Sequence, residues 1–376
     1  MCDNPTMVDR SVAQRRIGER VAEARAEASL TQAVLAVLVG MERTQLVRVE
    51  AGDRKVTVAE LAAIAAALGR SIEWFVNDAP AAVVSRRRDQ APAHDSSQAL
   101  DLALDRAARD VRFLVELGAL VDRPVDILPV PTSYAEAEGL AADVRGRLGL
   151  GDGPIDDLGA VVEALGLVWY AENLDPVAGD GACVELSGPN GGRVGVAIIN
   201  GACEPGRRRW TLVHELGHFL MGDAYAAEHP AGDVEKQINA FVAHLLMPRA
   251  GVERLWRAHS DDGPRRVAIA LAARYRVSWS AACNQLRNLD RVPASLRDQL
   301  VADAPTRGDF LAIGESWSED LRAPSVPPQY SQAVLGRYVA GDLSSSRAIE
   351  LLRGAIGPDE LPAVRAAERY PRLPSP

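Results

Sequence analysis

The sequence of 376 residues is poor in cysteine, and its four cysteines are Cys2, Cys183, Cys203 and Cys283. No two of them form a CxxC pair, which excludes a zinc ribbon and argues against a disulfide-stapled fold. No apolar run reaches the roughly 18 residues that a membrane-spanning helix needs. The first residues, with Asp3 and Asp9 among polar neighbours, do not fit a secretory signal peptide. These absences predict a cytoplasmic protein without a membrane segment.

The sequence also lacks the excess of basic residues typical of proteins that coat nucleic acid. It has 42 Lys and Arg against 51 Asp and Glu, which gives a net charge of −9. The segment from Arg10 to Asp78 is closer to neutral, with ten basic and nine acidic residues. Any contact with DNA must therefore come from one local face, and non-specific affinity should be modest. The length allows two or three domains.

Apolar residues recur at helical spacing from about Arg15 to Val76, which predicts five short helices. Thr31 stands where a helix N-cap should, Gly40 breaks the pattern, and Gly52 ends the helix that begins at Glu42. Two short helices around a tight turn have the order of a helix-turn-helix. Arg and Gln near the start of the second helix have side chains that match guanine and adenine edges.

This segment resembles the lambda-repressor-like (Cro/XRE-type) regulators over roughly residues 15–76. The resemblance rests on Leu30-Thr31-Gln32, Leu35-Ala36, Gly40 and Arg48-Val49-Glu50-Ala51-Gly52. It implies a five-helix domain, placed at residues 12–78, that binds double-stranded DNA. The contacts that it implies are Gln32, Arg43, Thr44, Gln45 and Arg48. Glu42 replaces the usual serine, and its charge beside phosphates would be mildly unfavourable. The alternative is a helical domain retained only for dimerisation or protein contact.

From Asp78 to about Gln98 the composition shifts to Ala, Pro, Ser and a cluster of three arginines, which predicts a linker. Residues 99–118 are expected to form a helix that serves as a spacer, a dimer contact or plain packing. One face of this helix carries Leu102, Ala103, Ala107, Val111 and Leu114. Residues 79–130 are therefore assigned to a linker and a connecting helix.

A second globular block begins near Pro131. Helices are expected at 134–149 and 155–165, strands at 167–171, 182–186 and 194–200, and further helices around His214, at 234–246 and at 261–288. Two or three helices follow Val292. The predicted fold is mainly α with a small β-sheet (α+β). It comprises the helix-turn-helix domain, a second globular domain at 131–292 and a helical C-terminal extension at 293–376.

The motif His214-Glu215-Leu216-Gly217-His218 indicates a metal site. On a helix the two histidines lie one turn apart and face one metal, while Glu215 is close enough to take a proton from water. By chance, such a motif should occur in roughly one chain in a hundred of this composition. Two histidines around a glutamate therefore favour a metal over satisfied core residues.

The third ligand must come from elsewhere, because the motif has no HxxGxxH continuation. The downstream candidates are Asp223, Glu228, His229, Asp233 and Glu235. Glu235 is favoured because it opens an amphipathic helix, on which Asn239 follows one turn later and is placed to orient it. Asp233 and His229 remain alternatives.

This block resembles the ImmA/IrrE family of zinc peptidases over roughly residues 134–292. The resemblance rests on RWTLVHELGH at 209–218 and EKQINAFVAHLLMP at 235–248, in which Ile238 stands where the family commonly has Ala. It implies a gluzincin-like core and limited cleavage of a regulatory protein, often a repressor. The site that it implies holds one zinc ion on His214, His218 and Glu235, with Glu215 as the base.

The sequence thus predicts a DNA-binding transcriptional regulator, able to form a homodimer, with a zinc-dependent peptidase domain that cleaves a regulatory protein. Glu215 is expected to protonate the leaving amine, and Tyr225 and His229 are candidates for oxyanion support. The covalent connection suggests that the peptidase controls, or is controlled by, the DNA-bound state. One alternative is a non-proteolytic regulator whose metal domain is a sensor or protein-binding platform. Another, an antitoxin-like partner, rests only on the pairing of domains.

Overall fold

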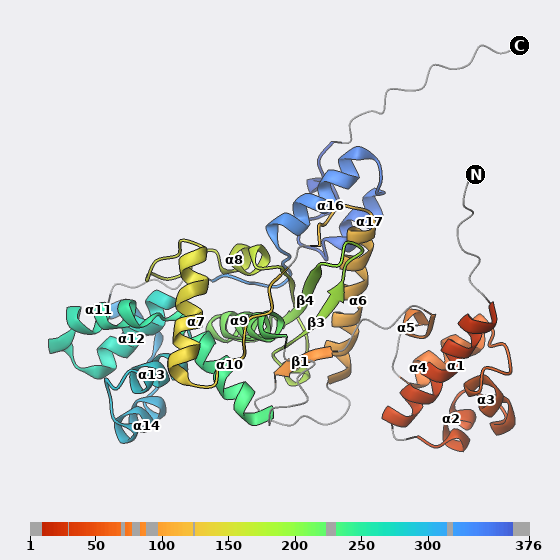
Figure 1. Cartoon of the computed structure of the whole chain (residues 1–376), viewed down its shortest axis with the longest axis horizontal. Coiled ribbons are helices and arrows are strands. Elements are labelled where there is room, and N and C mark those ends of the chain that lie inside the picture. The colour runs from red at the N-terminus through yellow and green to blue at the C-terminus, as the bar shows by residue number, and fades with distance from the viewer. Residues whose placement is uncertain are drawn as a thin grey trace, which may run out of the picture. The chain divides into compact units, whose positions relative to one another are not determined.

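A computed structural model describes residues 10–28, 30–68, 72–76, 83–87, 97–122, 125–222, 231–313 and 319–363. The chain forms two compact units, Met1–Ala79 and Pro80–Pro376 (Figure 1). Among the described residues, none of the helices is both long and apolar enough to cross a membrane.

The first unit is the predicted bundle of five helices. They are α1 (Arg10–Glu27), α2 (Gln32–Leu38), α3 (Arg43–Glu50), α4 (Val58–Ala67) and α5 (Ile72–Val76). The Thr31 hydroxyl accepts a hydrogen bond from the Val34 amide at 3.3 Å and so caps α2. Gly40 and Gly52 have φ of +66° and +75°, the left-handed conformation that lets α2 and α3 end sharply.

The second unit is built on a mixed four-stranded sheet. Its strands are β1 (Val83–Arg87), β2 (Leu167–Glu172), β3 (Gly181–Ser187) and β4 (Arg193–Asn200). Their order is β1-β3-β4-β2, with β2 parallel to β4 and β3 antiparallel to both of its neighbours. The small sheet among many helices confirms the α+β class.

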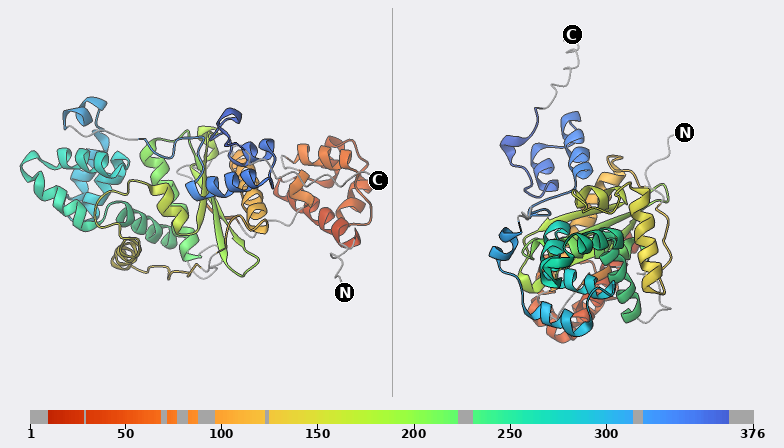
Figure 2. Two further views of the ribbon diagram at one scale, coloured as in Figure 1. Left: turned by 90° about the horizontal axis from the view of Figure 1, so that it is seen from above. Right: turned by 90° about the vertical axis from the view of Figure 1, so that its left-hand side faces the viewer.

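Alternate residues of the strands enter two separate cores, because successive side chains point to opposite faces. On one face Cys183 and Ile199 pack with α9 (Pro205–Met221) and α10 (Ala231–Leu246). On the other face Val184 and Ile198 pack with α6, α16 and α17. These helices are α6 (Ser97–Glu116), α16 (Pro328–Ala340) and α17 (Ser345–Leu351). The sheet thus lies between two layers of helices (Figures 1 and 2).

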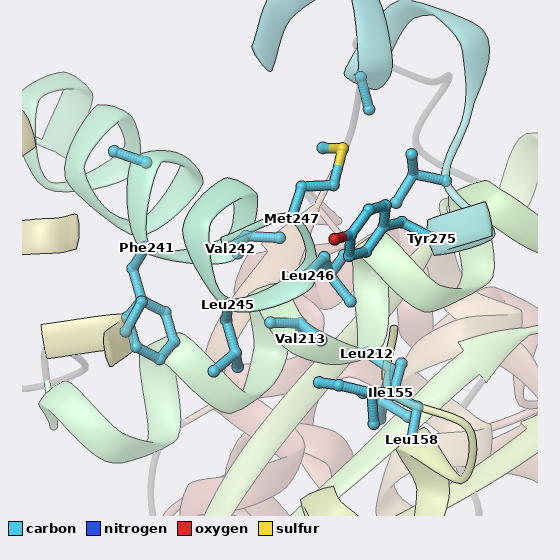
Figure 3. Packing of buried hydrophobic residues seen from close by; sticks show 14 of the residues in the cluster. Ile155, Leu158, Leu212, Val213, Phe241, Val242, Leu245, Leu246, Met247 and Tyr275 are labelled. Atoms are coloured by element: carbon cyan, nitrogen blue, oxygen red, sulfur yellow. The ribbon is translucent and has the colours of Figure 1, made fainter. Parts of the chain in front are cut away.

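The α9 face continues into a larger group of helices. They are α7 (Tyr134–Arg147), α8 (Leu158–Ala164), α11 (Arg249–Ala258), α12 (Pro264–Tyr275), α13 (Trp279–Asn288), α14 (Ala294–Ala302) and α15 (Arg307–Ala312). Short 3₁₀ turns occur at Pro176–Ala178, Ser260–Asp262 and Pro358–Glu360. Leu212 and Val213 of α9 lie in this core beside Leu245 of α10 and Tyr275 of α12 (Figure 3). All residues of α9 from Thr211 to Met221 are buried.

The segment 79–130 contains more structure than a linker and a helix. Strand β1 lies within the expected linker, and the buried residues Ala103, Ala107 and Val111 pack α6 into the core beside the sheet. The strand was missed because its five residues carry no periodic pattern and its partner lies about a hundred residues later in the chain.

The C-terminal segment 293–376 also differs from expectation, because its described part holds four helices, α14 to α17, instead of two or three. Between α15 and α16 the chain returns to the sheet, where the Ala171 and Ser325 amides donate to each other's carbonyl oxygens at 2.9 and 3.2 Å. The C-terminal segment thus contributes to both cores.

A buried ion network fixes α17 and the turn after it to α6 and β2. Asp110 of α6 accepts hydrogen bonds from Arg347 at 3.0 Å and from Arg353 at 2.7 Å. Arg353 also pairs with Glu172, and its guanidinium lies 4.9 Å from the centre of the Tyr170 ring. The side chains of Asp110 and Arg353 are each 7% exposed. Such a network is stable only while its charges remain paired.

We predict that Asp110→Ala lowers the free energy of unfolding of the second unit by about 3 kcal/mol, because the buried guanidinium of Arg353 loses one of its two carboxylate partners. The urea midpoint measures the change. Asp298→Ala is the control: its carboxylate pairs with Arg297 at the surface and is 64% exposed. Its loss should cost less than about 1 kcal/mol. Equal losses in the two variants would contradict the role of the network.

Candidate metal centre

The side chains of His214, His218 and Glu235 converge on one point. The two histidine Nε2 atoms are 3.0 Å apart. Glu235 Oε2 lies 3.4 Å from the Nε2 atom of His214, and Glu235 Oε1 lies 3.3 Å from that of His218. Each of the three residues offers one ligand atom, and these three atoms all lie within 4.8 Å of one another.

Two features of the helices create this convergence. The i, i+4 spacing puts both histidines on one face of α9, and Gly222, with φ of +61°, ends the helix directly after them. Gly217 lies between the histidines, where an added Cβ would stand 2.9 Å from Ile238 Cγ2 of α10. Glycine at this position therefore lets α10, which carries Glu235, approach α9 closely.

The geometry fits a divalent metal of the zinc type. In a tetrahedral site with bonds of about 2.1 Å, neighbouring ligand atoms are about 3.4 Å apart. The observed separations of 3.0, 3.3 and 3.4 Å are close to this value. Two imidazoles and one carboxylate form the ligand set of catalytic zinc sites, in which a fourth position stays open. The imidazoles are 2% and 4% exposed whereas the Glu235 side chain is 47% exposed, so the site opens on the Glu235 side.

Glu215, which lies between the two histidines in the sequence, is fully buried. Its main-chain carbonyl oxygen accepts a hydrogen bond from Cys183 Sγ of β3 at 3.6 Å. Strand β3 therefore lies directly against the turn of α9 that carries the motif.

Asn239 joins the two ligand-bearing helices. Its Oδ1 atom accepts a hydrogen bond from Trp210 Nε1 at 3.3 Å. Trp210 lies one turn before His214, and Asn239 lies one turn after Glu235. The bond thus spans α9 and α10 next to the ligands. Trp210 was missed as a site residue, and only its position four residues before His214 pointed to this role.

The other ligand and oxyanion candidates have different surroundings. Asp233 is exposed and pairs with Lys236 at 2.9 Å. Tyr225 and His229, like Asp223 and Glu228, lie outside the described residues.

The residues proposed to contact DNA lie on α2 and α3 in two kinds of environment. Arg43, Thr44 and Arg48 are exposed, whereas Leu46 and Val49 of the same helix are buried in the first unit. Gln45 Oε1 accepts a hydrogen bond from the Glu42 amide at 3.1 Å. Glu42 thus stands at the start of α3, and the Gln45 side chain binds its main-chain amide.

Gln32 is also bound within the fold. Its Nε2 atom donates to Glu50 Oε2 at 2.7 Å, and the same carboxylate pairs with Arg25 at 2.6 Å. The exposed face of α3 therefore carries Arg43, Thr44 and Arg48 together with the apolar Val47, while the two glutamines help to fix the helices.

Family models match both units. Residues 162–287 match a model described as the IrrE N-terminal-like domain, and residues 21–75 match a helix-turn-helix model. The chain carries a helix-turn-helix domain and an IrrE-like metallopeptidase domain. The resemblance predicted from the sequence is confirmed for both parts.

One curated relative is the radiation response metalloprotease IrrE of Deinococcus radiodurans. It is 34% identical over 108 residues, which cover 26% of this chain and 32% of that protein. The match thus spans about a third of the length of the relative.

Two solved structures of regulators align over most of the chain at low similarity. Bacillus thuringiensis PlcR in complex with the peptide PapR7 and DNA is 10% identical, covers 90% of this chain and 91% of its own, and has a TM-score of 0.18. ComR from Streptococcus suis is 13% identical, covers 90% and 94%, and has a TM-score of 0.16. TM-scores this low establish no common fold.

We predict that Trp210→Phe weakens zinc binding about tenfold, because the bond that spaces the ligand helices is lost while the aromatic ring remains. Competition with a chelator measures the affinity. Trp279→Phe is the matched control, since Trp279 Nε1 donates to Leu300 O at 2.7 Å between α13 and α14. The same affinity in the Trp210 and Trp279 variants would show that the bond does not position the ligands.

Proposed function

We propose that this chain is a DNA-binding transcriptional regulator whose second unit is a zinc-dependent peptidase that cleaves a regulatory protein, such as a repressor. The observation that carries the proposal is the convergence of His214, His218 and Glu235 on one point, beside Glu215, in a chain with a helix-turn-helix domain. The metalloprotease relative supports the same reaction class.

His214, His218 and Glu235 would hold one zinc ion, which supplies a Lewis acid for the peptide carbonyl and lowers the pKa of a water molecule. Glu215 accepts the proton of the attacking water and passes it to the leaving amine, since one carboxyl group can act as base and then as acid. Tyr225 and His229 remain candidates for support of the oxyanion.

The exposure of the ligands supports catalysis over a purely structural metal. A structural zinc site is closed by four protein ligands, whereas a catalytic site keeps a position for water and substrate. Among the described residues only three ligands converge, and the most exposed of them, Glu235, borders the open side. A metal domain that serves as a sensor or protein-binding platform without turnover is the alternative.

For DNA, we propose that residues 12–78 bind a double-stranded operator through α3, as a monomer or homodimer. The exposed side chains of Arg43 and Arg48 carry donors that suit base edges and phosphates. Gln45 and Gln32 would contact DNA only by exchanging or extending their bonds to Glu42 and Glu50.

We predict that Glu215→Gln keeps its zinc but cleaves a target repressor about 10²–10⁴-fold more slowly than the wild type, because the proton acceptor is lost. The measurement combines metal analysis with incubation of the zinc-loaded chain and repressors encoded beside it. His214→Ala should lose zinc and activity. His259→Ala, whose imidazole pairs with Asp262 at 2.9 Å, should retain both. Equal zinc in His214→Ala and the wild type would refute the metal assignment, and full zinc without cleavage would favour the platform.

We predict that Arg43→Ala and Arg48→Ala each weaken operator binding by about 1–3 kcal/mol if they read bases. Titration of labelled operator at fixed salt measures the change. Arg274→Ala removes the same charge from an exposed position of the second unit and should leave binding unchanged. Unchanged binding by the Arg43/Arg48 double variant would show that DNA is read elsewhere.

A further inference from the structure

Strand β1 occupies one edge of the sheet. It pairs antiparallel with β3, with Ser85 opposite Cys183 and Arg87 opposite Gly181. The pairing is short, and its register shifts between Val83 and Ser85. Figure 1 shows β1 beside β3, at the edge of the sheet.

This edge runs past the candidate metal centre. Cys183 is the β3 residue opposite Ser85, and its Sγ atom donates to the carbonyl oxygen of Glu215 at 3.6 Å. Strand β1 also lies against α9 itself. The ladder position shared by Ser85 and Cys183 is therefore level with the turn that carries the HExxH motif.

An edge of this kind binds extended polypeptides. A strand without a neighbour presents a row of main-chain N–H and C=O groups, and an added peptide strand can pair with them whatever its side chains. If β1 left, β3 would present such a row beside Glu215. A short pairing at a sheet edge also opens locally at low free energy, because few main-chain bonds hold it.

We propose that the outer edge of β3 is the docking surface for an extended segment of the protein substrate, and that β1 is its resident occupant and must leave first. This inference rests on the proposed peptidase function. The tether makes β1 an effective competitor, since a short linker holds a segment at about millimolar effective concentration. To displace β1, a substrate segment must therefore pair with β3 more strongly than β1 does at this effective concentration.

The same strand connects the two activities. Only residues 77–82 separate β1 from α5, the last helix of the DNA-binding unit. If the first unit pulls on these residues when it binds DNA or a partner, the covalent chain passes the force to β1. The release of β1 would then open the β3 edge to a substrate.

The test uses a labelled synthetic peptide of residues 79–90 and the full zinc-loaded chain. In one variant a Gly-Ser segment of equal length replaces residues 83–87. The wild type should show no binding below about 1 mM peptide, whereas the variant should bind at least about tenfold more tightly. Zinc content and circular dichroism confirm that the variant is folded. Equal binding by the two proteins would overturn the proposal.

Two methylated peptides provide the matched control. In an antiparallel ladder the amides of alternate residues face the neighbouring strand. One peptide is N-methylated at Arg86, and the other is N-methylated at both Ser85 and Arg87. Because the amides of neighbouring residues point in opposite directions, only one of the two peptides should lose binding. Equal binding of the two would show that the peptide does not pair as an edge strand.

A disulfide lock tests the same point without removing β1. Ser85→Cys introduces a cysteine at the ladder position paired with Cys183, and the Cα separation of antiparallel partners suits a disulfide. Oxidation should slow cleavage of the repressor at least about tenfold, and reduction should restore it. Wild-type protein under the same oxidant and Ser85→Ala are the controls. A cross-linked chain that still cleaves at the full rate would overturn the proposal. A chain that binds the peptide but cleaves nothing would refute the peptidase function and leave the pairing intact.

Discussion

The close contact between α9 and α10 at Gly217 determines where the three proposed metal ligands stand. Helix α9 is enclosed by the sheet on one side and by α10 on another, so both imidazoles are fixed before any ion binds. Ile238 fills the space that a side chain at position 217 would need. Glu235 therefore comes within 3.4 Å of the histidine nitrogens through helix packing, with no dedicated loop. Because these side chains are already ordered, little conformational entropy is lost when an ion binds.

Two buried arginines near the start of α9 are paired with carboxylates of the C-terminal segment. Arg208 pairs with Glu319 at 2.7 Å, and Arg209 pairs with Asp320 while donating to the Ile155 carbonyl at 2.9 Å. Burial lowers the pKa of Arg209, and the neighbouring Asp320 carboxylate opposes that shift. The arginine stays charged because its ordinary pKa is so high. Residues after 292 therefore help to support the helix that carries the proposed histidine ligands.

The features that sequence predicted well are local. The five helices of the first unit, the Thr31 cap and the facing histidines follow from periodicity and spacing within one or two turns. The features that it missed depend on distant partners: β1 pairs with a strand far along the chain, and Trp210 meets Asn239 across two helices. Gln45 stays a predicted DNA contact, and its bond to the Glu42 amide depends on a side-chain rotamer that spacing does not specify.

The central claim is that this metal site is built for catalysis, and X-ray absorption spectroscopy at the zinc edge of the purified chain tests it most directly. The account predicts two imidazole nitrogens, one carboxylate oxygen and a further light atom that is exchangeable, at about 2.0–2.2 Å. A sulfur ligand at about 2.3 Å, or a fourth ligand from the protein, would contradict it, because the site would then be closed.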